Sequence, residues 1–573
     1  MNKTIFITPW IIIHLLFLQS TTYAQNEIKR YDIIIHEIMA DPSPTIGLPA
    51  AEYIELYNRT SQTQSLHNWK LQLGNSSKKL PDVTLDSNGY VIIIAEKYLD
   101  QFAAICSNIC SLSSLSITDA GQTITLLNEN EQVIHSVSFK KNWHSESIKR
   151  DGGWSLEMID ADLPCIGFGN WNSSVDVTGG TPGAPNSIAQ SVGDYTPPEI
   201  ERITMKDSLT IRIFFTETVL PTLPFDTGTI RLEPFIPIQE VTEVAPDFVA
   251  LDIHLQRPLE SNKYYSVNIN GSLCDCAQNC IMKGAGISVG TPMLPKNGDL
   301  IINEILTHPK DGTDAEFVEI YNRSRHIIDL NEIKLGYGGD TLPDKAIVAC
   351  GSGCQIFPNQ YCCLCKNKLL TTEQYYCQDK HVLIACDSLP SFNNNNGIIF
   401  LTDFALRQID RFAYDKSMHH SGLSSTDGVS LERLSPDRPT QDAGNWHSAA
   451  STVGFATPGY PNSQSGFGES NDQISITPEV FSPDNDGYND FAEIRISTNE
   501  PEQRINIQIF NANGQTVKHL VSNELCGAEN VFRWDGQDDN GNILPSGMYL
   551  VIVQIWGTDA KTHKLKRVVS IRR

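Results

Sequence analysis

The sequence predicts an all-β protein made of several small β-sandwiches. Short runs rich in β-branched and aromatic residues recur along the chain, and Gly, Asn, Asp and Pro bound them; residues 90–94, 123–127 and 209–215 are examples. Runs of this length and composition are typical of strands. The chain has 573 residues, which is too many for one hydrophobic core and indicates about four domains.

An octet of residues occurs twice in the chain. It reads EYIELYNR at residues 52–59 and EFVEIYNR at residues 316–323, and a similar strand precedes each copy, IIIHEI at 33–38 and LIINEI at 300–305. Three further motifs follow each octet in the same order: GWSLE and GVSLE at 153–157 and 428–432, GNW at 169–171 and 444–446, TPGAPNS and TPGYPNS at 181–187 and 457–463. We infer one module used twice, module 1 at residues 30–190 and module 2 at residues 298–463.

This combination of motifs resembles the bacterial lamin-tail domain, a compact Ig-like β-sandwich. The resemblance covers a little over half of the chain and implies tandem Ig-like β-sandwiches displayed outside the bacterial cell, but no reaction. DNA binding of the kind attributed to nuclear lamin tails is not expected, because the net charge is -24 and no basic block is present. Affinity for nucleic acid depends on Lys and Arg that neutralise phosphates.

The N-terminus has the pattern of a secretory signal peptide, which we place at residues 1–24. Lys3 is followed by an apolar run from Ile5 to Leu18 and by the small-x-small sequence Thr22-Tyr23-Ala24. A membrane anchor is the alternative, but it needs about 20 apolar residues, and this run is shorter. No later segment is apolar enough to span a bilayer, so we expect an exported mature chain.

Two more domains complete the predicted order. Residues 194–290 contain three strand-like runs and resemble the Ig-like domains that often separate such modules, and residues 464–473 have the composition of a linker. Residues 474–573 carry PDNDGYND at 483–490, WDG at 534–536 and PSGMY at 545–549. This last set resembles the Ig-like domain of the flagellar hook-cap protein and the C-terminal sorting domains of Bacteroidetes type IX cargo. The resemblance implies that the outer-membrane secretion machinery is a partner and that the protein reaches the cell surface.

Fourteen cysteines in an exported chain favour disulfide bonds. The candidates are Cys106, Cys110, Cys274, Cys276, Cys280, Cys350, Cys354, Cys362, Cys363, Cys365, Cys377 and Cys386. The number of cysteines in each region is odd, so either some are free or some pair between domains or chains. The dense set from Cys350 to Cys386 could also form a thiolate metal site, but it lacks a clean pair of C-x-x-C knuckles. We favour disulfide staples in a long inserted loop.

The acidic stretch in the last domain offers oxygen ligands at alternate positions. Asp484, Asp486 and Asp490 surround Gly487, as in the first part of a calcium loop, but Arg495 stands where a bidentate Glu would close an EF-hand. The alternative is an Asx-rich turn that opens a sandwich. We favour the turn and keep calcium as the one candidate cofactor.

Aligning the modules also pairs three titratable residues. The pairs are Glu37 with Glu304, Glu55 with Glu319, and His144 with His419. A histidine with two carboxylates could serve acid–base or metal chemistry, but a glutamate on a strand usually lies on the solvated face, and a histidine beside a tryptophan is usually packed or a cap. No hydrolase, metalloprotease or nucleotide-binding motif occurs in a credible context. We therefore expect no enzyme.

The predicted function is structural or adhesive at the cell surface. Loops of β-sandwiches are the usual binding positions, and the partner would be an extracellular protein or glycan whose identity the sequence does not give. Two alternatives stay open. In the first, the chain is a carbohydrate- or protein-binding accessory of a secreted hydrolase system, and an aromatic residue such as Trp143 would contact the ligand. In the second, it is a metal-dependent enzyme with its site in the Cys-rich insertion.

Overall fold

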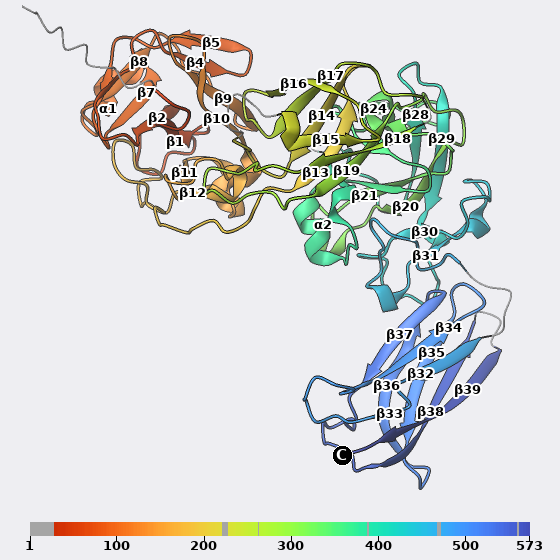
Figure 1. The fold of residues 1–573 in the computed structure, drawn as a ribbon. Helices are drawn as coiled ribbons and strands as arrows, with labels where there is room; N and C mark the ends of the chain where they lie inside the picture. The colour runs from red at the N-terminus through yellow and green to blue at the C-terminus, as the bar shows by residue number, and fades with distance from the viewer. Residues whose placement is uncertain (1–27, 221–226, 262, 387–388, 467–471, 558–560) are drawn as a thin grey trace, which may run out of the picture. The chain divides into compact units, whose positions relative to one another are not determined.

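The computed structural model describes residues 28–573 except 221–226, 262, 387–388, 467–471 and 558–560. The predicted signal peptide lies outside the described residues. Figure 1 confirms the all-β class: strands dominate, and the two α-helices of the described residues, α1 (Leu99–Phe102) and α2 (Lys368–Gln374), are short. Within the same residues no helix has the length and apolar character needed to cross a membrane. The chain forms two compact units, one up to Tyr195 that includes Ala245–Asp247 and one with the remainder.

Module 1 contains two main sheets. The larger has the strand order β12-β11-β1-β2-β7-β8, the smaller β10-β9-β4-β5, and β3 pairs with β6 beside them. Side chains of both sheets are buried, for example Ile54 and Leu56 on one and Ile124 and Leu126 on the other. The strands are β1 (Ile33–Met39), β2 (Tyr53–Asn58), β3 (Gln64–Ser65), β4 (Lys70–Leu73), β5 (Ser76–Lys79), β6 (Thr84–Leu85), β7 (Tyr90–Ala95), β8 (Ile109–Leu112), β9 (Gly121–Leu127), β10 (Val133–Lys140), β11 (Leu156–Met158) and β12 (Trp171–Ser173).

The region between the modules is a smaller sandwich. Its sheets have the orders β13-β14-β17-β16 and β15-β18-β19, and a core that includes Ile213, Ile253 and Val267 lies between them. The strands are β13 (Ile200–Met205), β14 (Thr210–Phe215), β15 (Ile230–Glu233), β16 (Ile238–Glu243), β17 (Ala250–Leu255), β18 (Tyr264–Ile269) and β19 (Ala285–Gly290).

Module 2 repeats the sheets of module 1 strand for strand. Its larger sheet has the order β27-β26-β21-β20-β30-β31 and its smaller sheet β24-β23-β28-β29, with β22 paired to β25. The strands are β20 (Leu300–Leu306), β21 (Phe317–Asn322), β22 (Ile328–Asp329), β23 (Lys334–Tyr337), β24 (Lys345–Val348), β25 (Gln355–Ile356), β26 (Tyr361–Cys365), β27 (Leu383–Ala385), β28 (Asn396–Thr402), β29 (Gln408–Asp415), β30 (Leu431–Arg433) and β31 (Trp446–Ser448).

The placement of the Cys-rich stretch in an inserted loop is wrong for its central part. Cys362, Cys363 and Cys365 belong to β26, which pairs with β21 just as β7 pairs with β2 in module 1. The cysteines occupy positions that branched aliphatic residues hold in β7. A cysteine is a small apolar side chain when it is buried, so these residues fit a strand that is covered on both faces.

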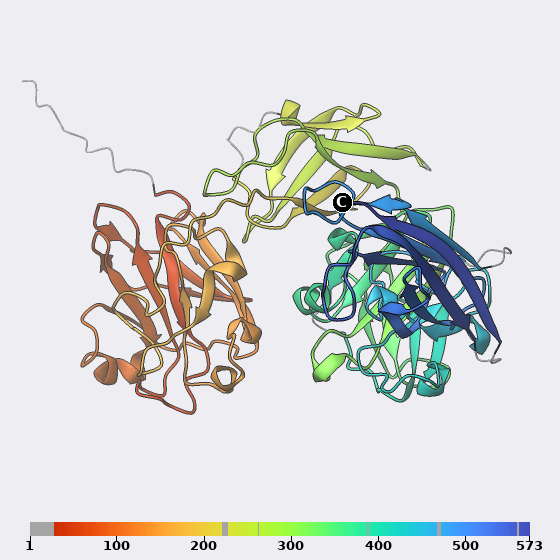
Figure 2. The ribbon, with the colours of Figure 1, turned by 90° about the horizontal axis from the view of Figure 1, so that it is seen from below.

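The C-terminal region is a third type of sandwich, drawn in blue in Figure 1 and, from below, in Figure 2. Its sheets have the orders β32-β34-β37 and β33-β39-β38-β35-β36, around a core that includes Ile494, Ile507 and Trp534. The strands are β32 (Gln473–Thr477), β33 (Val480–Phe481), β34 (Ala492–Ser497), β35 (Arg504–Phe510), β36 (Thr516–Leu525), β37 (Glu529–Trp534), β38 (Gly547–Trp556) and β39 (Thr562–Ile571).

Candidate functional site: two buried glutamate triads

Each module contains three glutamates in a row across its larger sheet. In module 1 Glu37 on β1 lies directly opposite Glu55 on β2 and Glu157 on β11. Module 2 has the same row, formed by Glu304, Glu319 and Glu432. All six side chains are fully buried, so the expectation of a solvated face for these glutamates is wrong.

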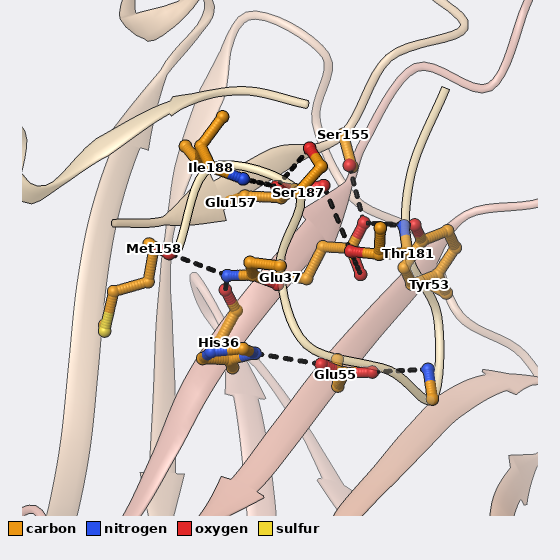
Figure 3. A network of polar contacts seen from close by, with 12 residues as sticks. His36, Glu37, Tyr53, Glu55, Ser155, Glu157, Met158, Thr181, Ser187 and Ile188 are labelled. Carbon is orange, nitrogen blue, oxygen red and sulfur yellow. Dashed lines mark hydrogen bonds and ion pairs between the residues drawn. The ribbon is translucent and has the colours of Figure 1, made fainter. Parts of the chain in front are cut away.

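A segment at the end of each module covers the glutamates, which accounts for their burial. We call residues 181–188 the strap of module 1 and residues 457–464 the strap of module 2. Strand alternation directs the glutamates to the outer face of the sheet, where the strap crosses them (Figure 3). The TPG-x-PNS motif therefore completes the sandwich of each module.

Backbone N–H groups of the strap in module 1 donate to each glutamate in turn. Thr181 N lies 2.8 Å from Glu37 Oε1, and Gly183 N lies 2.6 Å from Glu55 Oε2. Ile188 N lies 3.2 Å from Glu157 Oε2, which also accepts from Ser187 Oγ at 2.8 Å. The strap is thus bonded to three neighbouring strands, as Figure 3 shows.

The strap of module 2 repeats these bonds. Thr457 N donates to Glu304 Oε1 at 2.9 Å, Gly459 N to Glu319 Oε2 at 2.6 Å, and Gln464 N to Glu432 Oε2 at 2.9 Å.

An asparagine fastens each strap to the sheet backbone. Asn186 Nδ2 donates to the carbonyls of His36 and Met158, and Asn462 Nδ2 to those of Asn303 and Arg433. The Thr, Gly, Asn and Ser of the motif therefore each have a defined structural partner.

A β-bulge places one more polar side chain beside each triad. The register of β1 against β2 shifts between Ile35 and Glu37, and that of β20 against β21 shifts between Ile302 and Glu304. The extra residue is His36 in module 1, whose Nδ1 lies 2.9 Å from Glu55 Oε1. In module 2 it is Asn303, whose Nδ2 donates to Glu319 Oε1 at 2.9 Å. Bulges commonly redirect a side chain in this way.

Burial dominates the electrostatics of the triads. It raises the pKa of Glu37 to about 8, with the neighbouring charges of Glu55 and Glu157 acting in the same direction. It likewise raises the pKa of Glu319 to about 8, and the pKa of Glu304 lies well above its ordinary value through burial and the charge of Glu432. Burial lowers the pKa of His36 to about 4, so the imidazole is neutral at pH 7. These are the directions expected for ionisable groups out of contact with water.

The predicted grouping of a histidine with two carboxylates forms only in part. His144 Nδ1 lies 2.8 Å from Ser173 Oγ, and His419 Nδ1 lies 3.0 Å from Ser448 Oγ, away from the glutamates. The histidine that does contact a carboxylate is His36. Sequence reasoning missed His36, Glu157 and Glu432, although the repeated G-x-SLE motif contains the last two and could have identified them.

Trp143, the aromatic residue suggested as a carbohydrate contact, is buried. Its ring packs against Phe168 and Trp171, with centroids 5.7 and 6.2 Å away, and only 9% of its surface is exposed. A ring in this position stabilises the fold of module 1 and presents no face to a ligand.

The cysteines separate by strand face. Cys274 and Cys280 form a disulfide, and Cys276 is also disulfide-bonded. Alternation along β26 directs Cys362 to the core that contains Cys350 and Cys354, and Cys363 and Cys365 to the opposite face near Cys377. Cysteines that are not in disulfides in the described residues include Cys106, Cys110, Cys350, Cys354, Cys362, Cys363, Cys365, Cys377 and Cys526. Within that part of the chain no set of three metal-ligating atoms within 4.8 Å includes a cysteine, and the pairing of these thiols stays a prediction.

Asp484, Asp486 and Asp490 do come together, with carboxylate oxygens within 4.8 Å of one another. Asp490 accepts backbone N–H bonds from Asn485 at 2.7 Å and Gly487 at 2.9 Å, and Asp486 accepts one from Tyr488 at 2.7 Å. Bonds of this type define Asx turns. Calcium binding at this loop stays a prediction.

Two family models match the chain. Residues 27–141 match the Lamin Tail Domain, and residues 475–570 match the CHU_C Type IX secretion signal domain. The chain therefore carries a lamin tail domain in module 1 and a signal for type IX secretion at its C-terminal end, as the sequence motifs predicted. The protein is exported to the cell surface or beyond it.

Solved structures with some likeness include an α2-macroglobulin of Salmonella, the S-layer protein rSbsC and PorZ, a surface component of the type IX secretion system of Porphyromonas gingivalis. Their identities to this chain are 11, 11 and 9%, and the TM-scores are 0.14, 0.15 and 0.15. The alignments cover 66, 66 and 92% of this chain and 26, 54 and 86% of the others. The chain thus spans about a quarter and about half of the first two. A search of the curated proteins finds no match, and likenesses this low support no conclusion about function.

Proposed function

We propose that this exported protein, with its lamin tail domain and its type IX secretion signal domain, is a non-catalytic structural or adhesive component of the cell surface. Its sandwiches would space and present loops, and those loops would contact an extracellular protein or glycan. The observation that carries the proposal is the state of the glutamate triads, the groups in the chain that most resemble a reactive site.

Each carboxylate oxygen of the triads has a protein partner. Glu55 illustrates this: Oε1 contacts His36 Nδ1 and Oε2 accepts from Gly183 N. The other five glutamates are engaged in the same way, by the strap, by serine and threonine hydroxyls and, at Glu319, by the Asn303 amide. A general acid or base must reach a proton of its substrate. Buried carboxyls that are already fully bonded to the chain fit a structural role better.

One pair of loops in module 1 is a suitable binding surface. Ile148, Val175 and Val177 are 72, 58 and 87% exposed, and Lys149 Nζ donates to Ser174 O at 3.0 Å, which holds the two loops together. Exposed aliphatic side chains on two loops joined in this way favour a contact surface for another protein. This pair of loops favours an extracellular protein as the partner.

The first test compares intact cells that produce the full chain with cells that produce a chain ending before Ile474. Protease treatment followed by mass spectrometry should release peptides of modules 1 and 2 from the first cells only. Equal release from both would show that the last domain is not the export signal, and no release from either would contradict surface display.

The second test replaces the exposed aliphatic residues, as Ile148→Ser, Val175→Ser and Val177→Ser together. Binding of cells to extracellular-matrix proteins or to neighbouring cells should fall several-fold, while the thermal stability of the purified chain stays the same, because exposed side chains contribute little to folding. A matched control is Leu209→Ser, which removes a 41% exposed aliphatic residue of the middle region. Unchanged binding in the triple variant would refute these loops as the contact.

A further inference from the structure

One threonine hydroxyl in each strap lies between two glutamates. In module 2 Thr457 Oγ1 is 3.0 Å from Glu304 Oε2 and 2.8 Å from Glu432 Oε1. In module 1 Thr181 Oγ1 is 3.1 Å from Glu157 Oε1 and 3.4 Å from Glu37 Oε2. A hydroxyl has one hydrogen to donate, so it can satisfy only one of two ionised carboxylates. The second carboxyl must then donate a hydrogen to the threonine oxygen.

The other oxygens of these glutamates show where that hydrogen can sit. Glu304 Oε1 accepts from Ser430 Oγ and Thr457 N, and Glu432 Oε2 accepts from Ser463 Oγ and Gln464 N. Oxygens that already accept two donors have no room for a hydrogen of their own. The proton is therefore confined to the two oxygens that face Thr457. Module 1 has the same division, with Glu37 Oε1 accepting from Tyr53 Oη, Ser155 Oγ and Thr181 N.

The third glutamate differs. Glu319 faces two N–H donors, Asn303 Nδ2 on Oε1 and Gly459 N on Oε2. These hydrogen bonds oppose the rise in pKa that burial causes, and they leave neither oxygen of Glu319 facing an acceptor, so the shared hydrogen does not sit on this carboxyl.

We propose that each strap is held by one proton, shared between two glutamates through the strap threonine, and that loss of this proton at alkaline pH releases the strap. The two bridges are Glu37–Thr181–Glu157 and Glu304–Thr457–Glu432. This goes beyond the proposed function, because it makes each module a pH-sensitive element whatever the module binds.

The surroundings keep the proton in place. The charged groups that act on the carboxyls are other glutamates, which favour protonation of one member of each pair. The remaining titratable groups that face the triads are His36, Tyr53, Tyr90 and Cys106 in module 1 and Tyr361, Cys363, Tyr375, Cys377 and Tyr460 in module 2. Burial lowers the pKa of His36 and raises the pKa of the tyrosines and cysteines, so each of these groups is neutral at pH 7. Removing the shared proton would put two like charges against one hydroxyl.

A pair of isosteric substitutions in module 2 tests the hydrogen count. In Glu432→Gln the amide oxygen can accept from Ser463 and Gln464 while the amide N–H donates to Thr457, so the variant imitates the protonated bridge. In Glu319→Gln the amide N–H must face another N–H donor. We expect Glu432→Gln to keep the stability of the chain at pH 7 and Glu319→Gln to lower it. Equal effects of the two substitutions would contradict the proposal.

The direct measurement is infrared spectroscopy of the full chain. At pH 7 the carbonyl stretch of protonated carboxylic acids should be present, and it should be lost in the variant with both Glu157→Gln and Glu432→Gln. A wild-type chain without this band, or a band that survives in the double variant, would overturn the assignment.

The same double variant tests strap release by hydrogen exchange. At pH values above the one at which the bridge loses its proton, strap amides should exchange faster in the wild type than in the variant. The ratio of the two exchange rates should rise by about tenfold per pH unit. Identical strap exchange in the two proteins from pH 6 to 10 would show that the proton does not hold the strap.

Discussion

Modules 1 and 2 share their sheets and their strap, but they support the strap with different side chains. The differing pairs are His36 and Asn303, His135 and Asp410, Tyr53 and Phe317, and Gly180 and Ala456. Each pair occupies the same position in the two folds. The comparison shows which features the fold requires, because a requirement of the backbone is met twice by unlike residues.

One requirement is an acceptor for the N–H that precedes the bulge. Ile35 N donates to His135 Nδ1 at 2.8 Å, and Ile302 N donates to Asp410 Oδ2 at 2.8 Å. An unsatisfied buried N–H would cost about 1–3 kcal/mol, so both modules supply an acceptor. A neutral imidazole serves in one and a carboxylate in the other.

Another requirement concerns the space beneath the strap. In module 1 Tyr53 Oη donates to Glu37 Oε1 at 2.7 Å, and a Cβ on Gly180 would lie only 2.3 Å from Tyr53 Oη. Module 2 has no hydroxyl at Phe317, and Ala456 is fully buried at the position of Gly180. The hydroxyl and the methyl group exclude each other, so the two positions must change together.

The largest difference that we predict is in acid. Burial lowers the pKa of His36 to about 4 and that of His135 to about 3. The unfolded chain, in which a histidine titrates near 6.5, then binds more protons than the folded chain below pH 6.5. Each histidine costs up to about 1.4 kcal/mol per pH unit as the pH falls from 6.5 toward these values. Module 2 has Asn303 and Asp410 instead, and burial raises the pKa of Asp410, which favours stability in acid. We expect module 1 to lose structure first.

Hydrogen exchange at pH 7 and pH 4.5, followed by mass spectrometry, resolves the two modules. Peptides of β1 and β2 should lose protection at pH 4.5, while those of β20 and β21 keep it. The variant with His36→Asn and His135→Asp should remove the difference. If both modules open together in the wild type, the buried histidines do not set the acid limit.

The second prediction concerns the exclusion beneath the strap. Gly180→Ala should destabilise module 1 by about 1–3 kcal/mol, because the new methyl group displaces Tyr53 from Glu37. Tyr53→Phe alone should cost about 1 kcal/mol for the lost hydrogen bond. The double variant should be more stable than Gly180→Ala alone, which chemical unfolding of the full chain can measure as a coupling energy. Additive effects would mean that the side chains do not compete for this space.

These examples show how far the sequence alone leads. The two octets and the order of the later motifs were enough to predict the repeated sheets, because strand periodicity and repetition are both visible in a linear chain. The role of Thr181-Pro-Gly was not, since its partners Glu37 and Glu55 lie more than a hundred residues away. A motif rich in Pro and Gly indicates a boundary when only local propensity is considered. The covering of a sheet face is a tertiary effect that propensity does not contain.

The smallest predicted effect tests the bulge residue. Asn303 Nδ2 donates to both Glu319 Oε1 and Asn462 Oδ1, the latter at 2.7 Å. The His36 ring hydrogen-bonds to Glu55 Oε1 and not to the equivalent oxygen, Asn186 Oδ1, which is buried with no hydrogen-bond partner in the described part of the chain.

His36→Asn should give Asn186 that missing donor, a gain of about 1 kcal/mol. The loss of the ring contacts of His36 with Tyr57 and Tyr90, at 5.2 and 5.5 Å, opposes this gain by about 0.5–1.5 kcal/mol. A small net change in the midpoint of unfolding is therefore expected. Asn303→His, by contrast, removes the donor to Asn462 without a matched gain and should destabilise module 2. If both exchanges destabilise their modules equally, each bulge residue fits only its own surroundings and the two arrangements are not interchangeable.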